Sequence, residues 1–325
     1  MDNNNLFPFE NLENEELLPV TLDVVFKEIF GQEDSKPILR SFLNATLDLG
    51  IKIPEQIELL NPEINPEYLK DKKCILDIKV RLPDKTSIDV EIQVTNQYNM
   101  DKRSIYYVSK LCSDQLNSGD TYTELRPSIG LNILCYNMFD DDRYHHRFVL
   151  KDNSTNEVLS DLIRIEFLEI NKALQTISTK DKTHELNINT LTEVELWSLF
   201  IGSRNKEVLE MVATQNTAIK DAYSRLQRVS EDDKKRAQAI SREKALRDWN
   251  SSISASYNAG MTAGMAAGVA AGKADGMKEG RNQAIASAIH SMHSRNLSTD
   301  KILDELVALF QLTPAEALEA LENAL

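Results

Sequence analysis

Cysteine, long apolar runs and several common enzyme motifs are scarce or absent in this chain of 325 residues. Its three cysteines, Cys74, Cys112 and Cys135, are widely spaced and form no CxxC pair, which argues against a disulfide framework and a structural zinc site. No apolar run reaches about 18 residues, so no membrane-spanning helix is expected. The acidic, polar first residues are unlike a signal or transit peptide, and we therefore expect a cytoplasmic protein. Motifs of serine hydrolases, dinucleotide-binding enzymes and P-loop proteins are missing as well.

Positive charge is also in short supply, since 37 Lys and Arg face 51 Asp and Glu and the net charge is −14. Such an acidic balance speaks at first against nucleic acid as a partner. The charge is uneven, however, because residues 1–69 hold 14 acidic and 4 basic side chains, whereas residues 70–110 hold 9 basic and 6 acidic ones. DNA binding by the second of these segments is therefore permitted but not required.

Helix-like and strand-like segments alternate in the first half of the chain. Apolar spacing and capping residues predict a helix at 20–30, a second helix at 35–50 between the caps Ser35 and Gly50, a proline-rich loop at 54–70, a hairpin at 74–94, a helix at 101–117, and strands at 129–138, 147–152 and 163–171. This mixture predicts an α/β fold in which a mixed sheet is flanked by helices. From residue 191 onward the chain favours helices, with Trp197 and Phe200 as packing residues.

Changes in composition divide the chain into five segments. They are an acidic tail at 1–17, an α/β domain at 18–175, a charged helical region at 176–255, a glycine-repeat segment at 256–284, and a helical pair at 285–325. The acidic surface of the final pair suits assembly better than DNA recognition.

In the glycine-repeat segment a glycine recurs at every fourth position from Gly260 to Gly280. Each interior glycine costs a helix about 1 kcal/mol relative to alanine, so the six cost roughly 6 kcal/mol. The segment is therefore either a flexible linker or a helix whose glycine face receives another backbone at close range.

The main candidate catalytic and metal-binding residues lie in the stretch 74–94, CILDIKVRLPDKTSIDVEIQV. Folding it symmetrically about Asp84 in the turn pairs residues whose numbers sum to 168, so Asp77 lies opposite Glu91 with Cβ atoms about 4.5–5.5 Å apart. Two facing carboxylates repel each other unless a positive group lies between them. Mg²⁺, or another divalent cation such as Mn²⁺, is suited to that place, and the carbonyl of Ile92 could be a further ligand. Alternating polar residues are more often a merely solvated strand face, and from these residues alone both interpretations stay open.

Four further side chains are candidates for contacts with DNA phosphates. Arg103, Tyr107 and Lys110 fall at i, i+4 and i+7 of the expected helix at 101–117 and share a polar face. Lys79 lies on the same strand face as the acids, although the same pairing rule puts it opposite Asp89, which it could simply neutralise.

Other charged residues are weaker candidates. Lys27 and Glu28 lie on the first expected helix, where a surface role is more common. His145 and His146 have no acid or cysteine at metal-ligand spacing, so we expect them in a polar surface loop.

Four segments in a fixed order carry a family resemblance: DVVFKEIFG, LDIKV with IDVEIQV, KRSIYYVSKLCSDQLNSGDTY, and IGLNIL. Together they resemble the Rpn family of recombination-promoting nucleases and transposase-like proteins, within the PD-(D/E)XK nuclease superfamily. The resemblance implies a restriction-endonuclease-like core and a Mg²⁺-dependent DNA endonuclease linked to recombination or mobile elements. It implies that Asp77 and Glu91 bind the metal and that Gln93 takes the catalytic position where the superfamily usually has lysine. Glutamine can hydrogen-bond the attacking water but brings no charge.

Two other functions remain open from the sequence. The missing lysine and the acidic total charge are compatible with a catalytically weakened DNA-binding or regulatory module. The glycine repeat and the final helical pair are compatible with a protein whose main role is homo-oligomeric assembly.

Overall fold

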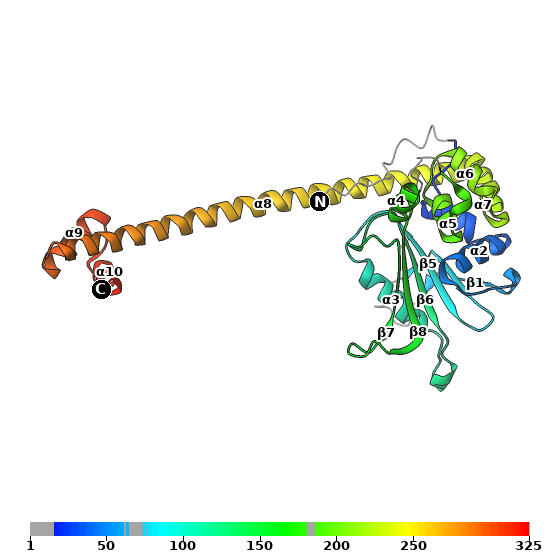
Figure 1. Cartoon of the computed structure of the whole chain (residues 1–325), viewed down its shortest axis with the longest axis horizontal. Coiled ribbons are helices and arrows are strands. Elements are labelled where there is room, and N and C mark those ends of the chain that lie inside the picture. The colour runs from blue at the N-terminus through cyan, green and yellow to red at the C-terminus, as the bar shows by residue number, and fades with distance from the viewer. Residues whose placement is uncertain (1–15, 62, 65–73, 76, 181–185, 325) are drawn as a thin grey trace. The chain divides into compact units, whose positions relative to one another are not determined.

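The computed structural model of the chain describes residues 16–61, 63–64, 74–75, 77–180 and 186–324. They fall into two compact units that divide at residue 250 (Figure 1). The subdivision expected within these units, with boundaries at 175, 255 and 284, stays a prediction.

A six-stranded mixed sheet forms the centre of the first unit, with the strand order β1-β4-β5-β6-β8-β7. Its strands are β1 (Glu58–Leu60), β4 (Ile78–Arg81), β5 (Ser87–Gln93), β6 (Ser128–Leu134), β7 (His145–Lys151) and β8 (Val158–Glu169). Neighbouring strands are parallel from β5 through β6 to β8 and antiparallel elsewhere. A separate two-stranded ladder joins β2 (Glu63–Ile64) and β3 (Cys74–Ile75).

Ten α-helices and four short 3-10 turns accompany these strands in the described part of the chain. The helices are α1 (Asp23–Phe30), α2 (Lys36–Leu47), α3 (Met100–Ser113), α4 (Ile170–Lys180), α5 (Glu193–Gly202), α6 (Lys206–Ala213), α7 (Thr217–Glu231), α8 (Asp233–Ser294), α9 (Thr299–Phe310) and α10 (Pro314–Ala324). The 3-10 turns are Glu33–Ser35, Pro54–Gln56, Tyr122–Glu124 and Ile188–Thr190. The predicted α/β class, a mixed sheet flanked by helices and followed by a helical region, is confirmed.

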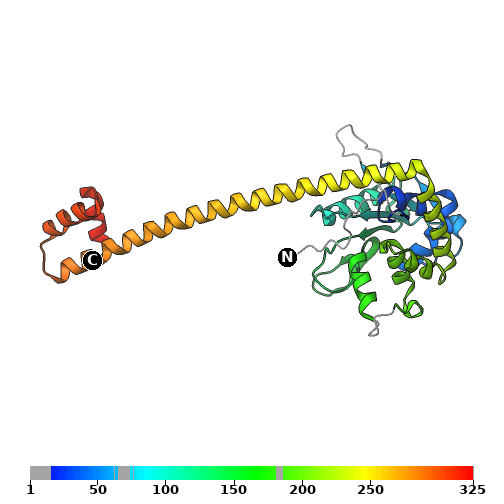
Figure 2. The ribbon, with the colours of Figure 1, turned by 90° about the horizontal axis from the view of Figure 1, so that it is seen from above.

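One face of the sheet packs against α1, α2 and the helices α5 to α7 (Figures 1 and 2). Its centre is an aromatic cluster in which Trp197 lies 5.6 Å from Phe30 and 5.7 Å from Phe42 between ring centroids. All three side chains are fully buried, as the sequence indicated for Trp197. Aromatic groups bury large apolar areas, so this cluster fixes α1 and α2 against the later helices.

The opposite face of the sheet is covered by α3 (Figure 1). Met100 and Val108 of α3 join Ile165 and Phe167 of β8 in a second, smaller core. Helix α3 thus has a buried apolar side toward the sheet, and the sheet is buried on both of its faces around β5 and β6.

One local prediction is wrong, because the proline-rich stretch at 54–70 is not loop throughout: β1 adds an edge strand that pairs with β4. Helix α2 has Ser35 at its N-cap position and ends before Gly50, as predicted, but the details of its ends differ. The Ser35 hydroxyl donates to the Gln32 carbonyl rather than to the helix, and Asp48 ends the helix in a left-handed conformation with φ 55°. Aspartate tolerates this conformation better than most residues, which is why a terminator other than glycine works here.

The second unit is a small helical cluster formed by the end of α8 with α9 and α10. Thr313 and Glu316 form a capping box at the start of α10, with the Thr313 N–H donating to Glu316 Oε2 at 2.8 Å and the Glu316 N–H donating to Thr313 Oγ1 at 3.3 Å. The glycine repeat is helical and belongs to α8. Throughout the described ranges, no helix is long and apolar enough to cross a membrane.

Candidate active site

The β4–β5 hairpin brings Asp77 and Glu91 together. Ile78 pairs with Val90 in the ladder, which confirms the predicted register. One residue before β4 begins, the Asp77 backbone N–H donates to Glu91 Oε1 at 3.1 Å, and Asp77 Oδ2 accepts the Ile92 N–H at 3.0 Å. The two carboxyl groups therefore lie side by side at the end of the hairpin.

The acids do not lie on a solvated strand face. Glu91 and its neighbour Asp89 are each only 2% exposed, because α3 covers this side of β5. Helix α3 is held there by a buried hydrogen bond of 3.0 Å from the Ser104 hydroxyl to Asn132 Oδ1, and Asn132 lies next to Glu91 in the β5–β6 register. The interpretation of these polar residues as merely solvated is therefore wrong.

Each carboxylate of the pair has a cation from a different helix. The ammonium of Lys27 on α1 lies 2.9 Å from Asp77 Oδ1. Arg103 on α3 approaches Glu91 Oε2 at 3.4 Å and donates to Gln93 Oε1 at 3.1 Å. The Gln93 amide nitrogen in turn donates to Glu91 Oε2 at 3.3 Å.

Burial and mutual repulsion disfavour the charged forms of Glu91 and Asp89. The pKa of Glu91 is raised to about 8, first by burial and then by the charge of Asp77, while Arg103 opposes the rise. The pKa of Asp89 is raised well above its ordinary value by burial and by Glu91, with Lys79 acting in the opposite direction. Among the residues that the structure describes, Asp89 Oδ1 has no hydrogen-bond partner.

A hard divalent cation fits this set of donors. In the described segments no three His, Cys, Asp or Glu side chains lie close enough to hold a metal, so the candidate ligands are the two carboxylates of Asp77 and Glu91 with one carbonyl. The N–H and C=O of a strand residue point to the same side, and since the Ile92 N–H meets Asp77, the Ile92 carbonyl faces that side too. Mg²⁺ often takes one or two carboxylates and completes its shell with waters and phosphate oxygens.

The candidate phosphate contacts lie at different places. Arg103 is beside the acids, and its guanidinium also lies 5.5 Å from the ring centroid of Tyr107 and 3.5 Å from its hydroxyl. Lys110 forms an ion pair of 3.5 Å with Asp114 on its own helix. Lys79 pairs with Asp89 across the hairpin, as its position in the sequence indicated.

Two charged residues of α1 have different partners. Glu28 forms an ion pair with Lys235 of α8 and so has a structural role. Lys27 instead contacts Asp77 and belongs to the site, which its sequence position did not favour.

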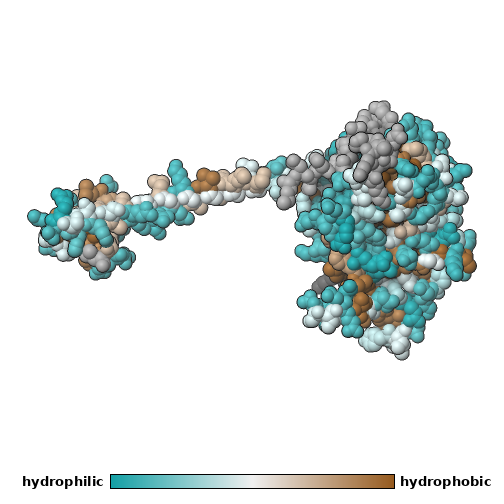
Figure 3. All heavy atoms as spheres, in the orientation of Figure 1, coloured by the Kyte–Doolittle hydropathy of each residue, from teal (hydrophilic) through white to brown (hydrophobic). Residues whose placement is uncertain are grey.

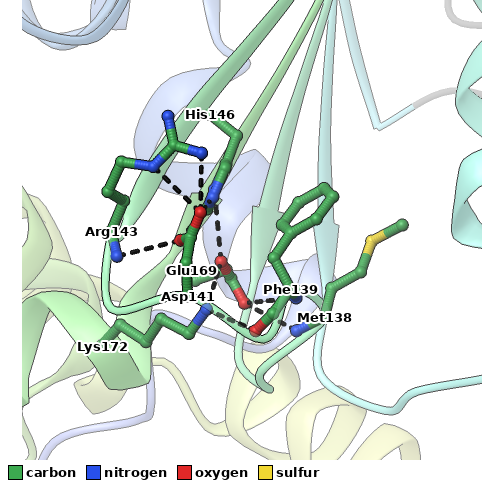
Figure 4. A network of polar contacts seen from close by, with 7 residues as sticks. All are labelled: Met138, Phe139, Asp141, Arg143, His146, Glu169 and Lys172. Carbon is green, nitrogen blue, oxygen red and sulfur yellow. Dashed lines mark hydrogen bonds and ion pairs between the residues drawn. The ribbon is translucent and has the colours of Figure 1, made fainter.

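The prediction for the two histidines is wrong. His145 and His146 begin β7, and His145 Nε2 lies 2.7 Å from Glu166 Oε2 of β8. His146 is 3% exposed and lies 2.9 Å from Asp141 and 3.4 Å from Glu169 (Figure 4). The partner acids come from the next strand and a neighbouring loop, which spacing along the sequence does not reveal.

The Glu169 carboxylate is the centre of the network in Figure 4. It is fully buried and accepts the Met138 N–H at 2.6 Å, and it forms an ion pair of 3.0 Å with Lys172 of α4. Buried charges need such partners, so this network fixes the loop after β6 to the end of β8.

Comparison with known families gives one match, which covers most of the chain. The family model of PD-(D/E)XK nuclease family transposases matches residues 20–256, which include α1, the hairpin and α3. No curated protein and no solved structure is similar enough to match. The narrower resemblance to the Rpn nucleases stays a prediction. Because the match covers more than half of the chain, the protein belongs to the PD-(D/E)XK nuclease family transposases.

Proposed function

We propose that the protein is a divalent-metal-dependent endonuclease that hydrolyses DNA phosphodiesters in recombination or in the movement of a mobile element. Its family implies nuclease chemistry and DNA as the partner. The observation that carries the proposal is the pairing of Asp77 with Glu91 at the end of the hairpin, between Lys27 and Arg103.

The position of each side chain indicates its role. Asp77, Glu91 and the Ile92 carbonyl would hold Mg²⁺ or Mn²⁺, which when bound would polarise the scissile phosphate and lower the pKa of a water. Both ends of the Gln93 amide are held, its oxygen by Arg103 and its nitrogen by Glu91, and this fixed orientation suits it to position the attacking water.

Basic and hydroxyl groups on this side of the sheet bind the DNA backbone. Arg103 contacts the phosphate nearest the acids, and the hydroxyl of Tyr107 adjoins its guanidinium. Lys110 lies farther along the same helix, and Lys79 lies on β4. Both side chains add positive charge for the DNA backbone.

Nicking of supercoiled plasmid tests the proposal. The wild-type chain should nick in Mg²⁺ and not in EDTA, and Asp77→Asn should reduce nicking to the level seen in EDTA. Asp161→Asn, which changes an exposed aspartate of β8, is the matched control and should cut like wild type. Cleavage in EDTA, or full activity of Asp77→Asn, would contradict the proposal.

One observation favours a catalytically weakened DNA-binding module instead. All four carboxylate oxygens of Asp77 and Glu91 already accept donors of the chain itself, two of them from backbone N–H groups. A cation must displace the side-chain donors among these. Calorimetry separates the two functions. If the wild-type chain binds DNA, and if Glu91→Gln binds Mg²⁺ no more weakly than wild type, this second function is the correct one.

Self-association through the C-terminal region is the remaining part of the proposal. A Cβ added at any glycine of the repeat would meet nothing within 4 Å in the described part of the chain. Met261, Met265 and Val269 are 47–72% exposed. Figure 3 shows apolar colour at several places on the surface of α8. A second helix packed on this face would offset the roughly 6 kcal/mol that six exposed glycines cost.

Light scattering on the full chain tests this association. Gly268→Leu should give a monomer, whereas Ala270→Leu, on the opposite side of the helix, should leave the oligomer intact. A monomeric wild type, or equal behaviour of both variants, would contradict it.

A further inference from the structure

The position of Lys27 beside Asp77 has no role in the site as described so far. Its ammonium contacts Asp77 Oδ1, while Asp77 Oδ2 is fixed by the Ile92 N–H. Lys27 is 35% exposed, whereas Asp77 is 12% exposed, so the ammonium lies where the buried acids meet solvent. An incoming phosphodiester would reach the site through that boundary.

The fold brings the last turn of α1 against the start of β4. Gly31 ends the helix by donating its N–H to the Lys27 carbonyl at 2.9 Å. A Cβ added at Gly31 would lie 2.9 Å from that oxygen, which is too tight to fit without a shift, so glycine suits the end of this helix. The same Cβ position lies 3.5 Å from Ile78 Cγ1, an ordinary contact distance, so the end of α1 packs directly on β4. Ile78 follows Asp77 directly, and the buried Phe30 fixes the rotation of the helix, which places Lys27 beside Asp77.

The reaction itself needs a positive charge on this side of the site. Attack of water on phosphorus forms one P–O bond and breaks the bond to the leaving oxygen. The water gives a proton to solvent, and the leaving oxygen takes one up. Negative charge gathers on the phosphoryl oxygens in between, and preorganised cations stabilise it. Gln93 is neutral, and Arg103 lies on the α3 side, beside Glu91 and Gln93, whereas Lys27 is the cation on the Asp77 side.

We propose that Lys27 is a catalytic residue of the nuclease, in contact with the scissile phosphate or the attacking water, and that it supplies from α1 the charge that Gln93 lacks. Lys27 acts here by its positive charge and not as an acid or a base. It is a compact cation on a flexible stem, so it can turn from Asp77 to the substrate when a metal takes its place. This inference rests on the proposed nuclease function.

Single-turnover cleavage at saturating DNA and Mg²⁺ tests the role of Lys27. Lys27→Met should lower the rate about 100-fold or more, in the range expected for the loss of one transition-state contact. Its affinity for Mg²⁺ should be unchanged or higher, because a competing cation is gone. Lys27→Gln, which keeps a polar head, should lower the rate by the same factor. It shows whether the loss in Lys27→Met comes from the missing charge or from a folding defect.

Lys235→Met is the matched control. Lys235 of α8 is also 35% exposed and pairs with Glu28, the residue after Lys27 on α1, so its removal takes an equal charge from beside α1 without touching Asp77. Its rate should stay within about twofold of wild type. The double variant Lys27→Met with Gln93→Lys should recover most of the lost rate, because charge returns to the site from β5.

The inference requires both the loss and the rescue. A wild-type rate in Lys27→Met, a loss confined to Mg²⁺ affinity or stability, or a double variant as slow as Lys27→Met would each overturn it and leave the nuclease assignment standing. Failure of the wild type to cut in Mg²⁺ would overturn the nuclease function itself.

Discussion

Mg²⁺ binding should release a proton from Glu91 near neutral pH. Burial and the neighbouring Asp77 raise the pKa of Glu91 to about 8, so at pH 7 about nine-tenths of this carboxyl is protonated before a metal binds. A cation needs the ionised form, and binding therefore expels close to one proton. The apparent affinity for Mg²⁺ should rise about tenfold for each pH unit up to pH 8 and then level off.

Calorimetry in two buffers of different ionisation enthalpy measures this release directly. At pH 7 the buffer dependence of the binding heat should correspond to nearly one proton per Mg²⁺. Glu91→Gln should abolish both the tight binding and the proton release. Asp77→Asn should remove the charge that helps to raise the pKa, so any residual binding should release less than one proton. An affinity independent of pH between 6 and 8, without proton release, would refute the reasoning.

Two further predictions concern stability. The raised pKa of Glu91 favours its neutral form in the folded state. Without metal, Glu91 therefore contributes fully to the free energy of unfolding below pH 4.5. This contribution, at most about 5 kcal/mol, is lost as the pH rises toward 8. Urea unfolding at pH 5 and pH 9 should show that loss in wild type and a smaller one in Glu91→Gln; equal losses would contradict it. Trp197→Ala should lower the free energy of unfolding by about 3–5 kcal/mol in the same assay, because it empties the centre of the aromatic cluster, and a loss below about 1 kcal/mol would argue against that packing.

The hairpin was the most predictable part of the site. A short turn centred on Asp84 and strict alternation determine the register, and the structure pairs Ile78 with Val90 as the sequence indicates. Local signals also identified α1 and α3, because helix periodicity depends on residues close in sequence.

Features that depend on distant segments could not be predicted in this way. Alternation alone suggested an exposed face for Glu91, and only the packing of α3 buries it. Lys27 reaches Asp77 across 50 positions of sequence, and His146 meets Glu169 from the next strand. Strand β1 was missed because the prolines on either side of it, Pro54 and Pro62, are typical of a loop, although an edge strand tolerates nearby proline.

Anomalous diffraction from crystals grown with Mn²⁺ tests the central claim most directly. One peak should lie between the carboxylates of Asp77 and Glu91, with the Lys27 ammonium moved away from Asp77 Oδ1. No peak at that place, or Mn²⁺ bound elsewhere while both acids keep their present partners, would contradict the account.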